Sequence, residues 1–163
     1  MRIFCLALII IVLLSFSASG NDDHGAEEVI KQIFPDAQTS TTETKFFQEQ
    51  EFKIYRILSE GKVIGWAVVL EEMGKIKPIT FLVGIGAQGK VMGVHVLEYR
   101  DMFGSEIKRR SFLKQFKGKS AEDPIRVGRD IDAVTQATIS SQAAATAVKK
   151  SLEVVQQIKK EKG

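Results

Sequence analysis

The most informative scarcity in this sequence of 163 residues is cysteine, which occurs once, as Cys5. A single thiol forms no internal disulfide, and it cannot supply the ligands of a cysteine-bound iron–sulfur cluster or the paired cysteines of a haem attachment motif. Cys5 also lies in an apolar segment that we expect to be removed, which would leave no cysteine nucleophile. Redox chemistry in this chain therefore requires a bound cofactor without sulfur ligands.

Histidine is nearly as scarce, with only His24 and His95 present. His24 lies in a polar linker. His95 lies on one face of an expected strand, where a packed, hydrogen-bonded histidine is the commoner role. Two separated histidines without further ligands do not make a metal centre, so the sequence predicts none.

A large excess of charge is missing as well, because the net charge is only +3, and +2 without Arg2, the only charged residue before Asp22. Basic residues do cluster in one stretch, at Lys108, Arg109, Arg110, Lys114, Lys117 and Lys119. No nucleic-acid-binding motif accompanies them. We therefore interpret them as the solvent side of a helix and expect no nucleic acid partner.

The apolar stretch at residues 3–16 is shorter than the ~20 residues that span a bilayer comfortably. It follows one basic residue and ends in four small residues at positions 17–20, a pattern typical of a secretory signal. We predict a signal peptide at residues 1–20, with an N-terminal anchor as the alternative, and one domain at residues 21–163. Such a protein is exported, to the periplasm or to the outer face of the cytoplasmic membrane.

Apolar spacing along the domain is first helical, then alternating as in strands, then helical again. Short glycine-containing turns join the strand segments in pairs, as in hairpins. The expected elements are a helix at 26–34, a loop or weak edge strand at 36–45, strands at 52–57, 63–70, 79–85 and 91–97, and helices at 106–116 and from Thr138 towards Lys160. This order predicts an α+β fold, with a largely antiparallel sheet built from hairpins, packed against helices, and a long C-terminal helix.

Individual residues carry sharper structural expectations. The strand at 91–97 has apolar side chains on both faces, which favours a central place in the sheet. Ser105 is the expected N-cap of the helix at 106–116, and packing explains Trp66 better than contact with a ligand. The long helix should face the core with Ala144, Val148, Leu152, Val155 and Ile158.

Residues 130–143 are polar and small where the long helix begins. The free N–H groups and the positive dipole end of a helix start attract anions, so a phosphate at Thr138, Ser140 or Ser141 would meet donors already in place. The same three side chains would also serve as ordinary helix caps. Composition alone leaves both interpretations open.

Asp132, Thr135, Ala137 and Thr138 match the pattern D-x-x-[ST]-G-A-T. This segment resembles the flavinylation motif of the FMN-binding domain family, which occurs in the sodium-translocating NADH:quinone reductase, in its C subunit, and in Rnf complexes, in their G subunit. The resemblance covers about residues 26–155, and Tyr99-Arg100-Asp101 is similar to the stand-alone exported branch. Upstream segments also resemble the sheet of the family: Gly65-Trp66-Ala67-Val68, Phe81-Leu82-Val83-Gly84-Ile85 and residues 89–97.

The resemblance implies an electron carrier or electron-transfer subunit, not an enzyme, with FMN joined to Thr138 through a phosphoester. It implies that a separate flavin transferase, dependent on magnesium and FAD, installs the FMN. It also implies redox donor and acceptor proteins, or a membrane redox complex, as partners. Further cofactor-binding candidates are Asp132, Thr135, Gln136, Ala137, Ser140, Ser141 and Tyr99. Asp132 either orients and helps deprotonate Thr138 or accepts backbone N–H bonds in the turn.

Gln136 departs from the family pattern, which has glycine there. Glycine adopts positive φ freely, whereas Gln in that conformation adds strain of about 1 to 2 kcal/mol and bulk beside the phosphate. Covalent attachment is one interpretation. A module that binds FMN without a covalent bond, a flavin-free module and a membrane-anchored redox subunit stay open as alternatives.

Overall fold

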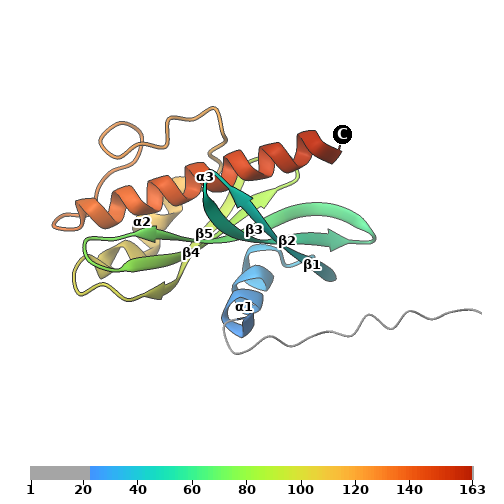
Figure 1. Cartoon of the computed structure of the whole chain (residues 1–163), viewed down its shortest axis with the longest axis horizontal. Helices are drawn as coiled ribbons and strands as arrows, with labels where there is room; N and C mark the ends of the chain where they lie inside the picture. The colour runs from blue at the N-terminus through green and yellow to red at the C-terminus, as the bar shows by residue number, and fades with distance from the viewer. Residues whose placement is uncertain (1–22, 163) are drawn as a thin grey trace, which may run out of the picture.

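The computed structural model describes residues 23–162, nearly all of the expected domain (Figure 1). The expected signal peptide or anchor at residues 1–20 lies outside the described residues. Within the described part, no helix is long and apolar enough to cross a membrane.

Five strands form one antiparallel sheet in which each strand pairs with its neighbours in sequence. They are β1 (Thr39–Phe47), β2 (Gln50–Ser59), β3 (Lys62–Met73), β4 (Pro78–Gly86) and β5 (Val91–Tyr99). Antiparallel neighbours need only short connections, which is why turn residues alone could place the hairpins. The expected α+β class with a largely antiparallel sheet is confirmed.

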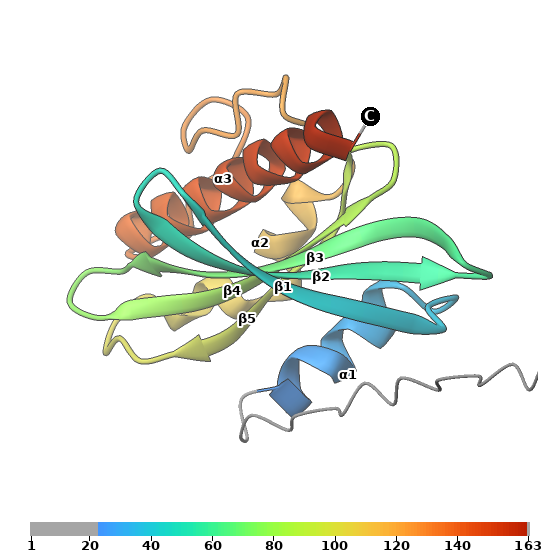
Figure 2. The same ribbon diagram turned by 45° about the vertical axis from the view of Figure 1, so that its right-hand side comes forward.

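Helix α1 (Asp23–Ile33) lies on one face of the sheet and α3 (Thr138–Lys162) on the other (Figure 1, Figure 2). Glycines on the central strands let the end of α1 approach the sheet closely. A side-chain carbon added to Gly65 would lie 2.6 Å from the Phe34 ring, and one added to Gly84 would lie 2.6 Å from Ile33. A second, smaller core forms between this helix and the sheet.

The main core lies between the sheet and α3. All five residues of the expected apolar stripe on α3 are buried, which confirms both the helix and its orientation. Trp66 is 7% exposed and packs in this core, as its apolar surroundings in the sequence indicated. The long C-terminal helix therefore rests on the sheet along the face opposite α1.

The expectation that the strand at 91–97 is central is wrong, because β5 is an edge strand paired only with β4. Both of its faces are nevertheless covered. Val94 belongs to the main core, and Leu97 packs into the smaller core under α1. Apolar side chains on both faces thus indicated helices on both sides, not further strands. The other edge, β1, is largely exposed, in keeping with a weak edge.

The expected helix at 106–116 is divided into η1 (Ser105–Lys108), α2 (Arg110–Leu113) and η2 (Lys114–Phe116). Arg109 has an extended backbone between the first two pieces. Ser105 is not the N-cap, because Gly104 precedes η1 with φ of 91° and no side chain caps it. The divided segment still packs on the main core through Ile107, Phe112 and Phe116, which are buried.

The two ends of the sheet are formed by different loops and by opposite ends of α3 (Figure 1). At one end, the start of α3 lies near the β3–β4 loop at residues 74–77 and the segment 100–104 after β5. The opposite end has the β2–β3 turn, the β4–β5 turn at residues 87–90 and the last turns of α3. The predicted attachment segment therefore lies at the first end.

Candidate functional site

The segment before α3 is a tight turn. The N–H of Ala137 donates to the carbonyl of Val134 at 2.9 Å, and Gln136 has φ of 64°. This left-handed conformation is the one that a turn normally gives to glycine or asparagine. The chain therefore adopts, with Gln at this position, a backbone conformation that glycine adopts freely.

Ser141 fastens this turn to the first turn of α3. Its Oγ accepts the N–H of Val134 at 3.1 Å and donates to the carbonyl of Ala137 at 2.9 Å. Ser141 is fully buried and does not line the cavity at the helix start. Its role is to hold the turn in place, which partly offsets the strain at Gln136.

Thr138 is the first residue of α3 and is exposed. The first N–H of this helix with a carbonyl partner is that of Ser141, which donates to Ala137 at 2.9 Å. The N–H groups of Thr138, Ile139 and Ser140 come before it and, as at any helix start, have no intrahelical acceptor. A hydroxyl and free donors therefore meet at one point, where the helix dipole favours negative charge.

A cavity of about 290 Å³ opens at this point. Its walls come from three separate parts of the chain: the β3–β4 loop, the segment after β5 and the start of α3. The lining residues are Lys75, Phe103, Gln136, Ala137, Thr138, Ile139 and Ser140. The cavity thus combines an anion-binding helix start and one cation with apolar walls.

Tyr99 ties the segment after β5 to α3. Its hydroxyl donates to the carbonyl of Phe103 and lies 3.1 Å from Ser140 Oγ. Gly104 makes this contact possible, because a side-chain carbon there would lie 2.5 Å from Ser140 Oγ and 3.0 Å from the Tyr99 hydroxyl. Burial raises the pKa of Tyr99, so the hydroxyl keeps its proton and remains a donor.

Asp101 ties the β3–β4 loop to the same segment. Its carboxylate accepts the N–H of Ile76 at 2.9 Å and that of Met102 at 2.8 Å. The hydrogen bond from Ile76, with others from the same loop, lowers the pKa of Asp101. The loop in turn places the Lys75 ammonium 5.3 Å from the centre of the Phe103 ring. Two cavity walls are therefore built around one carboxylate.

Asp130 organises the connection that leads into the attachment turn. Its carboxylate accepts the N–H of Arg126 at 2.8 Å and that of Ile125 at 3.1 Å, and it pairs with Lys119 at 2.8 Å. Burial opposes its ionisation, but these hydrogen bonds outweigh burial and lower the pKa to about 2. The next residue, Ile131, is buried, and this anchors the chain in the core shortly before the attachment turn begins.

The structure brings four of the eight predicted site residues to the cavity: Gln136, Ala137, Thr138 and Ser140. Tyr99 and Ser141 do not line the cavity, but their hydrogen bonds hold the segments that form its walls. Thr135 and Asp132 are exposed and do not line it. Asp132 is held by its backbone instead, since its N–H donates to Gln115 Oε1 at 2.9 Å and its carbonyl accepts from Nε2 at 3.3 Å.

Sequence reasoning missed three cavity residues: Lys75, Phe103 and Ile139. Phe103 lies within the stretch that begins at Tyr99, and Ile139 directly follows Thr138, so proximity along the chain was an available signal for both. Lys75 carried no such signal, because only the fold of the sheet brings its loop to α3.

No group of three or more histidine, cysteine, aspartate or glutamate side chains that could hold a metal ion occurs among residues 23–162. His95 is half-buried on β5, and burial lowers its pKa, as expected of a packed histidine.

Comparison with known proteins bears on whether this helix start is only capped or also holds a cofactor. Residues 74–153, which include every residue that lines the cavity, match the FMN-binding domain family. Residues 74–153 belong to the FMN-binding domain family. The expected resemblance is thereby confirmed, and membership in this family implies FMN as the cofactor.

Two relatives share this domain, and both are the G subunit of a ferredoxin:NAD(+) oxidoreductase complex. The one from the Na(+)-translocating complex of Acetobacterium woodii is 29% identical over 122 residues, which cover 69% of this chain and 59% of the relative. The one from the proton-translocating complex of Clostridium ljungdahlii is 32% identical over 109 residues, covering 62% and 58%. The chain thus spans less than two thirds of the length of either relative.

The cavity of this FMN-binding domain fits the chemistry of the cofactor. The free N–H groups at the start of α3 and the Lys75 ammonium suit a phosphoryl group, which needs hydrogen-bond donors and positive charge. The side chains of Phe103 and Ile139 are 55% and 47% exposed. They therefore offer apolar surface on which a flat aromatic ring can pack and be removed from water. Donors and apolar walls occur together in one cavity.

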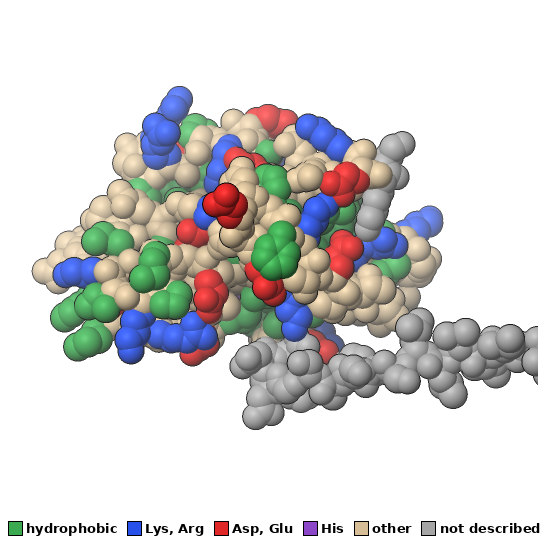
Figure 3. All heavy atoms as spheres, viewed as in Figure 1, with side chains coloured by type: hydrophobic (Ala, Val, Ile, Leu, Met, Phe, Trp, Pro, Cys, Tyr) green, Lys and Arg blue, Asp and Glu red, His purple; other side chains and the backbone are tan. Residues whose placement is uncertain are grey.

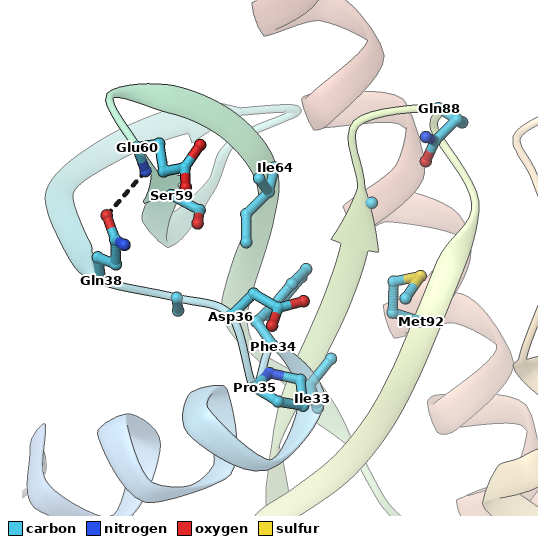
Figure 4. A pocket seen from close by; sticks show the side chains of 12 residues that line it. Ile33, Phe34, Pro35, Asp36, Gln38, Ser59, Glu60, Ile64, Gln88 and Met92 are labelled. Carbon is cyan, nitrogen blue, oxygen red and sulfur yellow. Dashed lines mark hydrogen bonds between the residues drawn. The ribbon is translucent and has the colours of Figure 1, made fainter.

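A larger cavity, of about 710 Å³, lies at the opposite end of the sheet (Figure 4). Side chains from the end of α1, the β2–β3 turn and the β4–β5 hairpin surround it, including Phe34, Ile64 and Met92. Asp36 and Glu60 make its rim acidic. It contains no residue of the attachment segment.

Proposed function

We propose that this protein is an extracytoplasmic electron-transfer flavoprotein that carries FMN through a phosphoester on Thr138. The observation that carries the proposal is the position of Thr138. Its side chain is exposed at the start of α3, lines the cavity, and lies inside the region that matches the family. The helix start supplies free N–H donors beside it.

Attachment transfers the FMN part of FAD to the protein. Thr138 Oγ1 attacks the phosphorus on the flavin side of the FAD pyrophosphate, a new O–P bond forms, the pyrophosphate P–O bond breaks, and AMP leaves. The threonine proton passes to the solvent or to a base of the transferase. A threonine hydroxyl is a poor nucleophile at neutral pH, so a separate magnesium- and FAD-dependent flavin transferase supplies the activation.

The residues of the chain bind and orient the product of this transfer. The N–H groups of Ile139 and Ser140 and the Lys75 ammonium stabilise the phosphoryl charge. The side chains of Phe103 and Ile139 exclude water on the side of the cavity that faces the flavin ring. When bound, FMN supplies a ring that accepts and returns one or two electrons, at a potential set by its surroundings.

The Gln136 backbone supports covalent attachment over a flavin-free module. The left-handed φ of 64° is retained without glycine, and Ser141 holds the turn on both sides. The Gln136 side chain lines the cavity and adds bulk, so we expect slower attachment than with glycine.

The apolar segment at residues 3–16 supports a proposal of export, and the similarity to subunits of redox complexes supports a proposal of redox partners. We propose a protein of the periplasm or of the outer face of the cytoplasmic membrane, either free or as part of a membrane redox complex. Covalent attachment suits this location because it prevents loss of a cofactor that is not replenished outside the cytoplasm. Redox donor and acceptor proteins exchange electrons with it, and it has no substrate of its own.

Intact-mass measurement tests the proposal. The chain is produced with and without a flavin transferase, and the mass should rise by one FMN less one water only with the transferase. Thr138→Ala should remove the adduct, whereas Thr135→Ala, which deletes an exposed hydroxyl in the same turn outside the cavity, should keep it. A yellow protein without added mass would mean FMN held without a bond, and a colourless one would contradict the proposal.

A further inference from the structure

Large apolar side chains are exposed around the cofactor end beyond what the cavity needs. Met73, Ile76 and Met102 are 61%, 53% and 77% exposed, and none of them lines the cavity. We call these three residues the apolar rim. A flavin in the cavity would cover Phe103 and Ile139 and leave the rim in water. Exposed apolar groups gathered at one place are characteristic of an interaction surface.

The apolar rim is held in place by a buried carboxylate. Ile76 and Met102 lie on different segments, yet both donate their backbone N–H to Asp101, which is 8% exposed. The rim therefore needs little ordering when a partner arrives, which reduces the entropy lost on binding. Figure 3 shows hydrophobic side chains gathered at the left-hand end of the molecule, where α3 begins, with Lys and Arg side chains beside them.

Within the two segments that carry the apolar rim, 73–77 and 101–110, the exposed charges are all positive, and the exposed carboxylates just outside them, Glu71 and Glu98, both pair with Arg100. Lys75, Lys77, Lys108, Arg109 and Arg110 are exposed in the two segments 73–77 and 101–110. The same segments hold two carboxylates, of which Asp101 is buried and Glu106 is partly buried. An approaching partner therefore meets cations around an apolar centre, an arrangement complementary to an acidic protein surface.

We propose that the apolar rim docks an electron-transfer protein whose own redox centre is surrounded by acidic side chains. The inference rests on the proposed function, because a partner docked there lies beside the cavity that holds the flavin. The cations attract and orient the partner, and the rim supplies the apolar contact that closes the short path between the two redox centres. Electron-transfer complexes of this kind are small and short-lived.

The test measures electron transfer from the FMN-loaded full chain, reduced with dithionite, to two ferric probes: acidic cytochrome b5 and basic cytochrome c. Each reduced flavin gives one electron to each of two haems, which become ferrous, and its protons go to the solvent. We expect the rate with cytochrome b5 to fall about tenfold between low and high ionic strength, and the rate with cytochrome c not to fall.

Variants locate the surface. Lys77→Glu with Arg109→Glu should lower the cytochrome b5 rate about tenfold at low ionic strength. The matched control, Lys62→Glu with Lys90→Glu, reverses two exposed charges at the opposite end of the sheet and should change the rate less than about twofold. Met102→Gln should slow cytochrome b5 about threefold and leave the rate with ferricyanide, a small anion, unchanged.

Two results would overturn the docking surface. One is a control double variant that slows cytochrome b5 as much as the rim double variant does. The other is binding of the wild-type chain to vesicles containing phosphatidylglycerol that Lys77→Glu with Arg109→Glu abolishes, since the rim would then be a membrane surface. Titration calorimetry with cytochrome b5 needs no flavin, so it tests docking even if no FMN is attached and the proposed function fails.

Discussion

The two ends of the sheet each carry a cavity, yet their walls are held differently. Around Thr138, the cavity of about 290 Å³ is closed by side chains that bond across segments, from Tyr99, Asp101 and Ser141. Around the larger cavity of about 710 Å³, the bond drawn between lining residues is the one from the Glu60 N–H to Gln38 Oε1, at 2.8 Å (Figure 4). Of these two cavities, the smaller one is therefore the one with the more extensively bonded walls.

Both ends also place a residue other than glycine at positive φ. Gln136 has φ of 64° beside Thr138, and Glu60 has φ of 49° in the β2–β3 turn. In the β2–β3 turn, the strained residue belongs to a hairpin, and its N–H donates to Gln38 Oε1. Beside Thr138, it sets the direction in which α3 begins. The same backbone feature therefore belongs to a hairpin at one end and to the proposed attachment turn at the other, and variants can separate the two.

The largest effect is expected from Gly104→Ala. The added carbon would lie 2.5 Å from Ser140 Oγ, at a backbone φ of 91°. We expect a loss of about 3 kcal/mol in the free energy of unfolding, from overpacking and left-handed strain together, and reduced flavin attachment. Urea unfolding and intact mass measure the two results.

Gly61→Ala is the matched control at the opposite end. Gly61 has φ of 73°, and no atom lies within 4 Å of an added carbon. Strain alone should therefore lower the free energy of unfolding by about 1 kcal/mol, with flavin attachment unchanged. Equal losses in the two variants would show that the close contact of Gly104 with Ser140 has no energetic importance.

Tyr99→Phe should have the next largest effect. It removes the hydroxyl that bonds to Ser140 and to the carbonyl of Phe103, and Ser140 is only 2% exposed. A buried hydroxyl that loses its partner lowers stability by about 1 to 2 kcal/mol. We expect faster amide hydrogen exchange in residues 100–104 than in the wild type. Unchanged exchange there would contradict the role of Tyr99 in holding the cavity wall.

Acid should weaken the connection that leads to Thr138. The pKa of Asp130 is lowered from 3.8 to about 2, so its stabilisation is present above pH 4 and is lost as the pH falls through 2. Asp130 is 20% exposed, and allowing for solvent screening we expect a contribution of about 1 kcal/mol. As the pH falls from 5 to 2.5, the free energies of unfolding of the wild type and of Asp130→Asn should converge. A difference that stays constant over this range would show that ionisation of Asp130 does not cause the stabilisation.

The smallest expected change is a gain. Gln136→Gly relieves left-handed strain and should raise the free energy of unfolding by about 0.5 to 1 kcal/mol. It should also speed flavin attachment, because bulk leaves the cavity. Glu60→Gly should give a similar gain in stability and no change in attachment. If both variants attach flavin at the wild-type rate, Gln136 is not a barrier.

Sequence reasoning predicted the hairpins and the long helix because their signals are local: alternation, turn glycines and the apolar stripe of α3. It also predicted that the long helix begins near Thr138, which is the first residue of α3. It failed where tertiary packing decides. Helices on both faces made β5 look central, and Gly104 with an extended Arg109 broke the helix expected at 106–116. Lys75 reaches the cavity only through the fold.

The central claim is that FMN is bound at Thr138, at the smaller cavity. Its most direct test is peptide mapping of the chain produced with a flavin transferase, digested with trypsin. Cleavage after Arg129 and Lys149 gives the peptide 130–149, which also contains Thr135, Ser140 and other hydroxyl residues. Fragmentation of this peptide should place one FMN, less one water, on Thr138. FMN on another residue, or a chain that stays unmodified beside an active transferase, would contradict the claim.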